Sequence, residues 1–478
     1  MRITHGIGHK LRVSDFCQVQ LGPFRLLRYD EPHGWKKIEK AKKKSTVRHT
    51  RAIQRDRSKR PIAAPPAEQA RERLRELILP ATQAEQEAAC TTFGVRIRKL
   101  TLVVMMALVL SLIWQQIGSL TDGVRLLSTG GLLWASAVTV SQQAASQRLG
   151  SLPAELFLRV LVAVLPVMHT RWQRRQRPLP PELAWAQAHY TQVVACDGST
   201  LDALLRKIGL LREALLNPLA GRMTALPDLC SRLPCRVWYE SDPEAHDQRF
   251  WEQILSALQV GALPLFDLGY TNFQVFARLT AAQVTFITRA KSNLAYTVER
   301  PLHRSANVHD SLVWIGSGAE RQLVRLVQVL YRGKWYRYLA NELDTERLPT
   351  EYVVALYWQR WRIEDAYAIV KRLLGLAYFW TGAENGVCLQ LWATWILYAV
   401  LVDLTDAVAE ALNQPFAAIS IEMIYRGLYF FGQAMQRGEA TDPIAYLVAN
   451  VKLLGLLKRK RKRLSLALLQ NLTSSAKP

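Results

Sequence analysis

Between residues 68 and 188, apolar side chains recur every three or four positions, and this spacing predicts a mainly helical segment. The pattern then changes. Short apolar runs at 190–196, 263–266 and 284–288 have the length and composition of buried strands. We therefore expect strands of a buried sheet to begin near residue 190.

Residues 292–342 show alternating apolar and polar positions and an Arg332-Gly333 turn, which together predict a β-meander. From residue 350 to 374 the helical spacing returns, directly after Pro349 and ending before Gly375. Strands mixed with long helices in this way predict an α/β fold.

Two stretches without a charge, 100–121 and 126–147, raise the alternative of a membrane protein. Each reaches the ~20 residues that span a bilayer. However, both end in polar halves, and apolar cores of roughly 15 residues favour buried helices. Residues 1–60 also contain no apolar core of a signal peptide. We expect no membrane partner.

The charge is strongly uneven. The 478 residues contain 62 Lys and Arg against 39 Asp and Glu, a net charge of +23. Most of the excess lies in three clusters, at residues 36–60, 171–177 and 458–463. Basic arms on a balanced body favour a polyanion partner, because neutralised phosphates release counterions. A solvated tail or a membrane-surface patch remains open.

Composition excludes two other classes of protein. Half of the residues are hydrophobic, more than a disordered chain contains. Six cysteines in 478 residues are too few for a disulfide-stapled module.

Two predicted strands end in isolated carboxylates. Asp197 follows the first strand and Asp267 the second. Gly198 comes directly after Asp197, and Gly269 comes two positions after Asp267. The glycines would let the backbone turn sharply. An ordinary Asp-Gly turn is the alternative to a functional site.

The predicted helix at 350–374 places Tyr357, Arg360, Glu364 and Lys371 on one narrow stripe. A solvated face with an Arg360–Glu364 pair would explain this stripe without chemistry. Together with the two strand-end acids, however, Glu364 completes a set of three carboxylates. Such a set could hold two Mg²⁺ ions for an in-line displacement at phosphorus.

The spacing of these residues resembles the Tyr-Arg-Glu-Lys signature of DDE insertion-sequence transposases, in the family named after insertion sequence four. Other segments are similar to that family's first-Asp and second-Asp motifs, its connecting motifs and its helical leader. These are Asp197-Gly198-Ser199-Thr200-Leu201, Asp267-Leu268-Gly269-Tyr270, His246-Asp247, 286–291, 339–341 and 93–99.

The resemblance implies an RNase H-like catalytic core in which Asp197, Asp267 and Glu364 bind two Mg²⁺ ions, with Mn²⁺ as a substitute. It also implies a β-rich insertion between the second and third acids. The residues that it implies as contacts to the DNA are Tyr357, Arg360, Lys371, Arg289 and Lys291.

We accordingly expect a cytoplasmic, nucleoid-associated DNA transposase of prokaryotic origin. It would cleave the ends of its insertion sequence and join the 3′-hydroxyl to target DNA. Its partners would be double-stranded DNA, as terminal inverted repeats and target, and a second copy of the chain in the DNA complex. The alternatives are a catalytically inactive, transposase-derived nucleic-acid-binding protein and a membrane-associated basic protein.

The expected domains follow from these boundaries. They are a basic N-terminal arm or small DNA-binding segment (1–66), a helical domain (67–188), the RNase H-like core (189–291 and 343–402), the β-rich insertion (292–342), and a C-terminal helical region with a basic cluster (403–478).

Overall fold

The computed structural model describes residues 64–65, 68–96, 98–202, 219–242, 244–376, 379–381, 383–458 and 466–474. The predicted basic arm lies almost entirely outside these residues, as does the basic cluster at 458–463 apart from Lys458. The roles expected for both therefore stay predictions.

Helices form the N-terminal part of the described chain, as the apolar spacing predicts. They are α2 (Glu68–Thr92), α3 (Leu102–Trp114), α4 (Leu120–Gly130), α5 (Gln142–Ser151), α6 (Glu155–Arg174) and α7 (Pro181–His189).

The two uncharged stretches have different outcomes. The first forms α3, a short helix that is buried along nearly all of its length. The second was expected to form one buried helix, which is wrong: it is divided between α4 and α5. α4 ends at Gly130 because Gly131 has φ +74°, which is not a helical conformation. A side chain would not fit at Gly131, since its Cβ would lie 2.4 Å from the Ala135 carbonyl oxygen.

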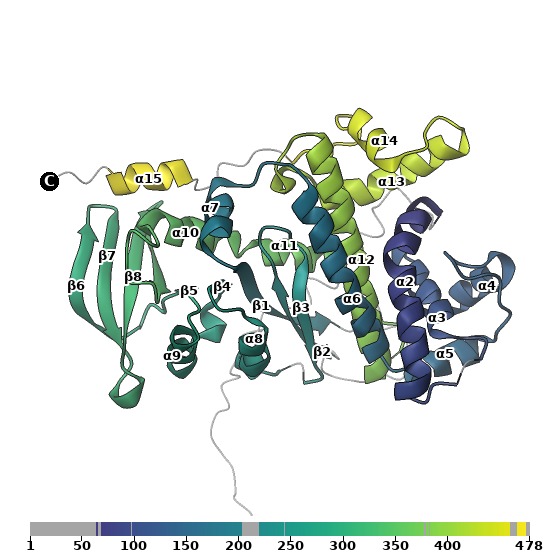
Figure 1. The fold of residues 1–478 in the computed structure, drawn as a ribbon, viewed down its shortest axis with the longest axis horizontal. Helices are drawn as coiled ribbons and strands as arrows, with labels where there is room; N and C mark the ends of the chain where they lie inside the picture. The colour runs from purple at the N-terminus through teal and green to yellow at the C-terminus, as the bar shows by residue number, and fades with distance from the viewer. Residues whose placement is uncertain are drawn as a thin grey trace, which may run out of the picture. The chain divides into compact units, whose positions relative to one another are not determined.

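A nine-stranded sheet runs through the described residues in the order β3-β2-β1-β4-β5-β9-β8-β7-β6 (Figure 1). β1, β4 and β5 are parallel neighbours, and the other pairs are antiparallel. The protein is thus mixed α/β. The strands are β1 (Gln192–Asp202), β2 (Leu219–Pro227), β3 (Pro234–Glu240), β4 (Ala262–Phe266), β5 (Ile287–Arg289), β6 (Tyr296–Arg304), β7 (Val308–Ile315), β8 (Gln322–Tyr331) and β9 (Lys334–Ala340).

β1 does not end at Asp197, where the sequence predicted its end. Its parallel pairing with β4 stops at Cys196, which faces Phe266, but the strand continues. Beyond that point it pairs antiparallel with β2, beginning with Asp197 opposite Ala225. Asp197 therefore lies where the pairing of β1 with β4 ends and its pairing with β2 begins.

The predicted meander is present as β6 to β9 and extends the same sheet. β9 pairs with β5, with Ile287 opposite Ala340. A fully buried ion pair fixes the meander to the next helix: Arg325 on β8 binds Asp310 on β7 and also donates to the Leu348 carbonyl and the Thr350 hydroxyl. Whether residues 292–342 are a separate domain stays a prediction.

The long helix predicted for 350–374 is interrupted. α10 (Thr350–Gln359) ends at Arg360, α11 (Arg362–Ala368) follows after Trp361, and a π-helical turn (Ile369–Leu373) completes the segment. No proline or glycine causes the break. The side chain of Arg360 is 3% exposed and points toward carboxylates of the sheet. The break between α10 and α11 therefore coincides with a tertiary contact.

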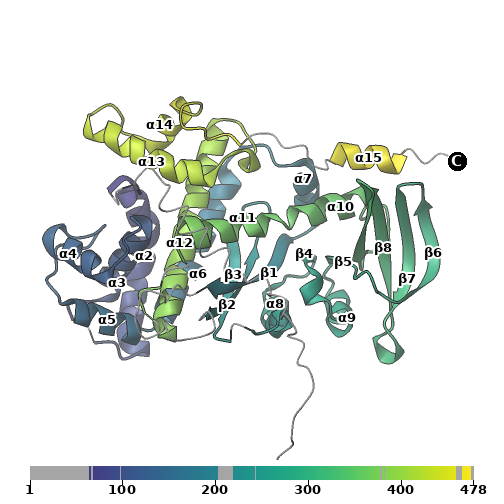
Figure 2. The same cartoon turned by 180° about the vertical axis from the view of Figure 1, so that it is seen from behind.

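The chain then forms α12 (Glu384–Ala411), α13 (Ile421–Gln436), α14 (Pro443–Ala449) and α15 (Leu466–Ser474). In Figures 1 and 2, α12 and α6 lie side by side next to β3. Among the described residues, α12 is long and apolar enough to cross a membrane, as are α5 and α6 if that bent pair counts as one span. However, 94% of the apolar window of α12 is buried in the protein, as in a core helix.

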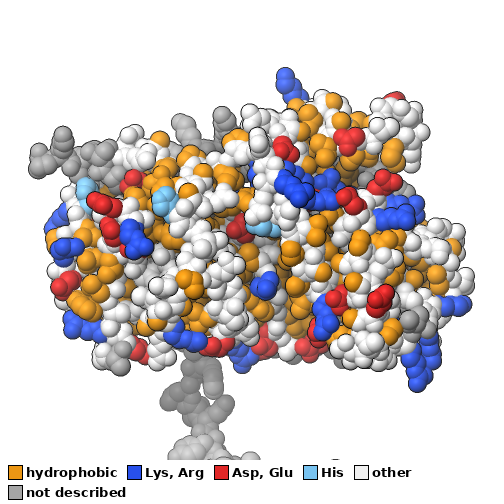
Figure 3. All heavy atoms as spheres, in the orientation of Figure 1, with side chains coloured by type: hydrophobic (Ala, Val, Ile, Leu, Met, Phe, Trp, Pro, Cys, Tyr) orange, Lys and Arg blue, Asp and Glu red, His pale blue; other side chains and the backbone are white. Residues whose placement is uncertain are grey.

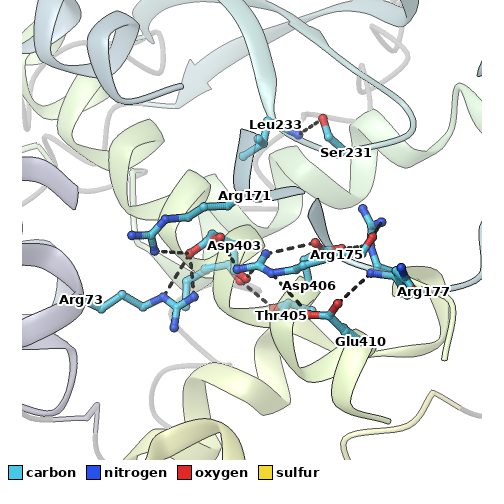
Figure 4. Close-up of polar contacts among 12 residues, drawn as sticks. Arg73, Arg171, Arg175, Arg177, Ser231, Leu233, Asp403, Thr405, Asp406 and Glu410 are labelled. Carbon is cyan, nitrogen blue, oxygen red and sulfur yellow. Dashed lines mark hydrogen bonds and ion pairs between the residues drawn. The ribbon is translucent and has the colours of Figure 1, made fainter. Parts of the chain in front are cut away.

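The basic cluster at 171–177 is not a free cationic surface, contrary to what the sequence suggested. Asp403 and Asp406 of α12 are almost fully buried and accept hydrogen bonds from arginines of this cluster (Figure 4). Arg175 lies 2.6 Å from Asp403 and 3.1 Å from Asp406, and Arg177 lies 2.5 Å from Asp406. The cluster joins α6 to α12.

We predict that Arg175→Ala lowers the free energy of unfolding by about 1.5–3 kcal/mol, because two buried carboxylates lose charged hydrogen bonds. Arg174→Ala is the matched control, since Arg174 is exposed and should leave stability unchanged. Urea denaturation of the full chain measures both variants. Equal stability of the two would contradict a structural role for Arg175.

Candidate active site

The three predicted acids surround a single guanidinium. Arg360 Nη1 lies 3.1 Å from Asp197 Oδ2, and Nη2 lies 3.6 Å from Asp267 Oδ2 and 4.0 Å from Glu364 Oε1. The sheet explains the first two positions, because Asp197 and Asp267 directly follow the last paired residues of the neighbouring strands β1 and β4. Glu364 comes from α11. The structure therefore brings the three acids together around Arg360.

The site is open on one side. The Asp197 side chain is 20% exposed, whereas Asp267 and Glu364 are 41% and 49% exposed. Arg360 is almost fully buried, so its charge lies beneath the carboxylates. Asp267 and Glu364 are therefore the two acids of the site that solvent reaches most easily.

Two tyrosines hold the acidic segments. The Tyr357 hydroxyl donates to Asp267 Oδ1 at 3.2 Å. The Tyr367 hydroxyl donates to the Asp197 carbonyl oxygen at 2.6 Å and accepts from the Ala225 amide at 3.1 Å. Tyr367 therefore connects α11 to both β1 and β2.

Burial governs the protonation of these groups. It raises the pKa of Asp197 to about 6, although Arg360 opposes the shift. It also raises the pKa of Glu364, again against Arg360, and holds the pKa of the Tyr357 phenol well above its usual range. A further cation beside Asp197 and Glu364 would lower their pKa values, because positive charge favours the ionised form.

The donor set fits a hard divalent cation. Asp197, Asp267 and Glu364 offer only oxygen, the ligand that Mg²⁺ prefers. Within the described residues, however, no three His, Cys, Asp or Glu side chains are arranged so that they could hold a metal ion. The acids share Arg360 but do not form a closed chelate, and binding an ion would require their side chains to move.

The residues expected to contact DNA lie in different surroundings. Tyr357 and Arg360 are buried against the acids, and Lys371 donates to the Thr200 carbonyl of β1. Arg289 is partly buried at the end of β5, and Lys291 is exposed two residues later. Their contact with DNA stays a prediction.

Sequence reasoning did not assign a role to Asp247 and Arg222. Asp247 begins the 3-10 turn Asp247–Phe250, and its Oδ1 forms an ion pair with Arg222 of β2 beside Gly198. The motif His246-Asp247 was the available signal for Asp247. Arg222 had none, because its partner lies 25 residues away along the chain.

Comparisons with known proteins point to one class of protein. Residues 222–399 match the family described as "Transposase DDE domain". That segment includes Asp267 and Glu364, whereas Asp197 precedes it. This segment of the chain is therefore similar to a transposase DDE domain.

Two curated proteins are similar to part of the chain. One is the putative transposase y4zB of Sinorhizobium fredii, 28% identical over 172 residues, which are 34% of this chain and 47% of the relative. The other is the probable transposase for insertion sequence element IS5377 of Geobacillus stearothermophilus, 26% identical over 180 residues, or 37% and 47% of the two chains. The chain thus spans about half the length of these curated relatives. Both are named as transposases, and one as that of an insertion sequence.

Proposed function

We propose that this protein is a DNA transposase that cleaves the ends of its insertion sequence and joins the freed 3′-hydroxyl to target DNA. The observation that carries the proposal is the convergence on Arg360 of Asp197 and Asp267, just beyond the β1–β4 pairing, and of Glu364 from α11. The match of residues 222–399 to a transposase DDE domain supports the same activity.

The sheet supports an RNase H-like core. Its first five strands follow the order β3-β2-β1-β4-β5, with β1 to β3 antiparallel and β4 and β5 parallel to β1. This arrangement and the Tyr-Arg-Glu-Lys spacing are our reasons for assigning the chain to the family named after insertion sequence four.

In this proposal Asp197, Asp267 and Glu364 would hold Mg²⁺, and the bound metal would supply activation of the attacking oxygen and stabilisation of the leaving oxygen. Tyr357 orients Asp267 through its hydrogen bond. Arg360 offsets the charge of the three carboxylates, with which it is paired.

The predicted partners and location follow from this activity. Lys371, Arg289 and Lys291 would contact phosphates of the terminal repeats, and two copies of the chain would bring two ends together. On the face shown in Figure 3, Lys and Arg side chains are scattered among acidic ones rather than gathered in one patch. The basic segments near the chain ends would add contacts to the DNA phosphates. A cytoplasmic location at the nucleoid would place the protein beside this DNA.

One observation favours the alternative of an inactive, nucleic-acid-binding relative. Arg360 neutralises the acids, and no group of three acidic or metal-binding side chains among the described residues is arranged to hold an ion. Cleavage separates the two functions. We expect the full chain to nick DNA that carries the inverted repeats flanking its gene when Mg²⁺ is present, and not when EDTA replaces it. Binding without cleavage in Mg²⁺ or Mn²⁺ would support the inactive relative.

Tyr367→Phe should reduce this cleavage about 10–100-fold, because Asp197 loses a group that positions it. Tyr398→Phe is the matched control, since its hydroxyl also donates to a buried carbonyl, that of Arg232, away from the acids. Each change should lower the free energy of unfolding by about 1–3 kcal/mol. If the two variants lose cleavage equally, stability and not position explains the loss.

A further inference from the structure

The carboxylate of Asp247 lies against both glycines that follow the strand-end acids. A Cβ added at Gly198 would lie 2.1 Å from Asp247 Oδ1, and one added at Gly269 would lie 2.9 Å from Oδ2. Any side chain at Gly198 would therefore displace Asp247, and one at Gly269 would press on it. One carboxylate thus touches the segments that carry Asp197 and Asp267.

Neither glycine is required by backbone conformation. Gly198 and Gly269 are not among the residues with positive φ. Gly198 is also paired within a strand, opposite Thr224. The two glycines therefore do not serve to form sharp turns. Both make room for the Asp247 side chain.

Arg222 holds Asp247 in this place. It lies on β2 opposite Thr200 of β1, and its Nη2 forms an ion pair with Asp247 Oδ1. Both side chains are largely buried, at 17% and 18% exposure. The guanidinium also lies within 3.0 Å of the position that a Gly198 Cβ would occupy. The pair is thus enclosed by β1, β2 and the segment after β4.

We propose that this ion pair, the Arg222–Asp247 brace, is a positioning device that sets the separation of Asp197 and Asp267 for binding a divalent cation. The inference rests on the proposed function of the three acids. Asp247 and Arg222 are positioning residues, because their charges are paired with each other and act through the glycine segments.

The brace should act on metal affinity. Groups that orient metal ligands typically contribute about 10–100-fold to affinity. Asp247→Asn keeps the size of the side chain but removes its charge, so the brace weakens without a new cavity. We expect Mn²⁺ to bind about tenfold more weakly or worse to this variant, as measured by calorimetry on the full chain with Mn²⁺ alone.

The glycines provide a second, graded test that leaves Asp247 itself unchanged. Gly198→Ala should weaken Mn²⁺ binding more than Gly269→Ala, in the order of the two close approaches. Combining Gly198→Ala with Asp247→Asn should cost little beyond the larger single effect, because both act on one contact. If Asp247 and Gly198 had a purely structural role, their losses of Mn²⁺ affinity would add in the double variant. The electron paramagnetic resonance spectrum of Mn²⁺ bound to each variant would then match that of the wild type.

Two matched controls lie outside the brace. Asp242→Asn also removes a paired aspartate, whose partner Arg249 is exposed, and Gly150→Ala adds a Cβ where nothing lies within 4 Å. Both should bind Mn²⁺ like the wild type. Thermal denaturation of each variant identifies any that fails to fold.

Asp197→Asn separates failure of the brace from failure of the proposed function. If Asp197→Asn loses Mn²⁺ binding while Asp247→Asn and Gly198→Ala stay within about twofold of wild type, the brace is rejected and the metal site stands. If Asp197→Asn binds Mn²⁺ like the wild type, the proposed metal site itself is rejected.

Discussion

Glu364→Gln should abolish Mg²⁺-dependent cleavage of end DNA, by about 10³-fold or more, while DNA binding is retained. The change is isosteric and removes one negative charge from the set around Arg360. Because the side chain is about half exposed on α11, its loss should hardly affect folding. Nicking of labelled end DNA and a gel-shift titration measure the two properties on the same preparation.

The neighbouring residue provides the control for this variant. Asp365 is an exposed acid on the same helix, and we assign it no contact with the site. Asp365→Asn should therefore cleave like the wild type. Cleavage by Glu364→Gln at more than about a tenth of the wild-type rate would reject Glu364 as a catalytic residue.

Asp310→Ala should lower the free energy of unfolding by about 3–5 kcal/mol, because Arg325 would be left charged and unpaired in a fully buried position. Asp310 and Arg325 are both 0% exposed, and Asp310 also accepts from the Thr350 hydroxyl at 2.6 Å. Guanidinium denaturation of the full chain measures the loss.

The Arg437–Glu439 pair is the control for burial. Both side chains are exposed at 56%, so Glu439→Ala should produce no measurable change. A loss of less than about 1 kcal/mol for Asp310→Ala would mean that Arg325 finds another partner or reaches water. In that case the pair would not fix the start of α10.

Local patterns predicted β4 and the meander, because short or alternating apolar runs reflect burial, but they did not predict β2 and β3. The strand β4 lies within one residue of the predicted run, and its five residues are all buried. The end of β1 was mispredicted for the opposite reason. Residues 197–202 are mostly polar or small, and only pairing with β2, some twenty residues away, makes them a strand.

Partners distant in sequence explain the other differences. The cluster at 171–177 was interpreted as a cationic surface, but Asp403 and Asp406, which neutralise it, lie more than 220 residues later. The helix break at Arg360 has no local signal either. The acids themselves were predictable, because isolated carboxylates at two strand ends and one helical stripe have few structural uses. Their common contact with Arg360 was not.

The pairing of β5 with β9 limits how this chain can be shortened. β5 has only three residues, and β9 covers the edge that β4 does not. Cutting out residues 292–342 would leave that edge unpaired, and open strand edges promote association between chains. A shortened variant would therefore tend to aggregate even if its acids were intact. The Gly316–Glu320 turn between β7 and β8 is the better place for an inserted tag, since it carries no pairing of its own.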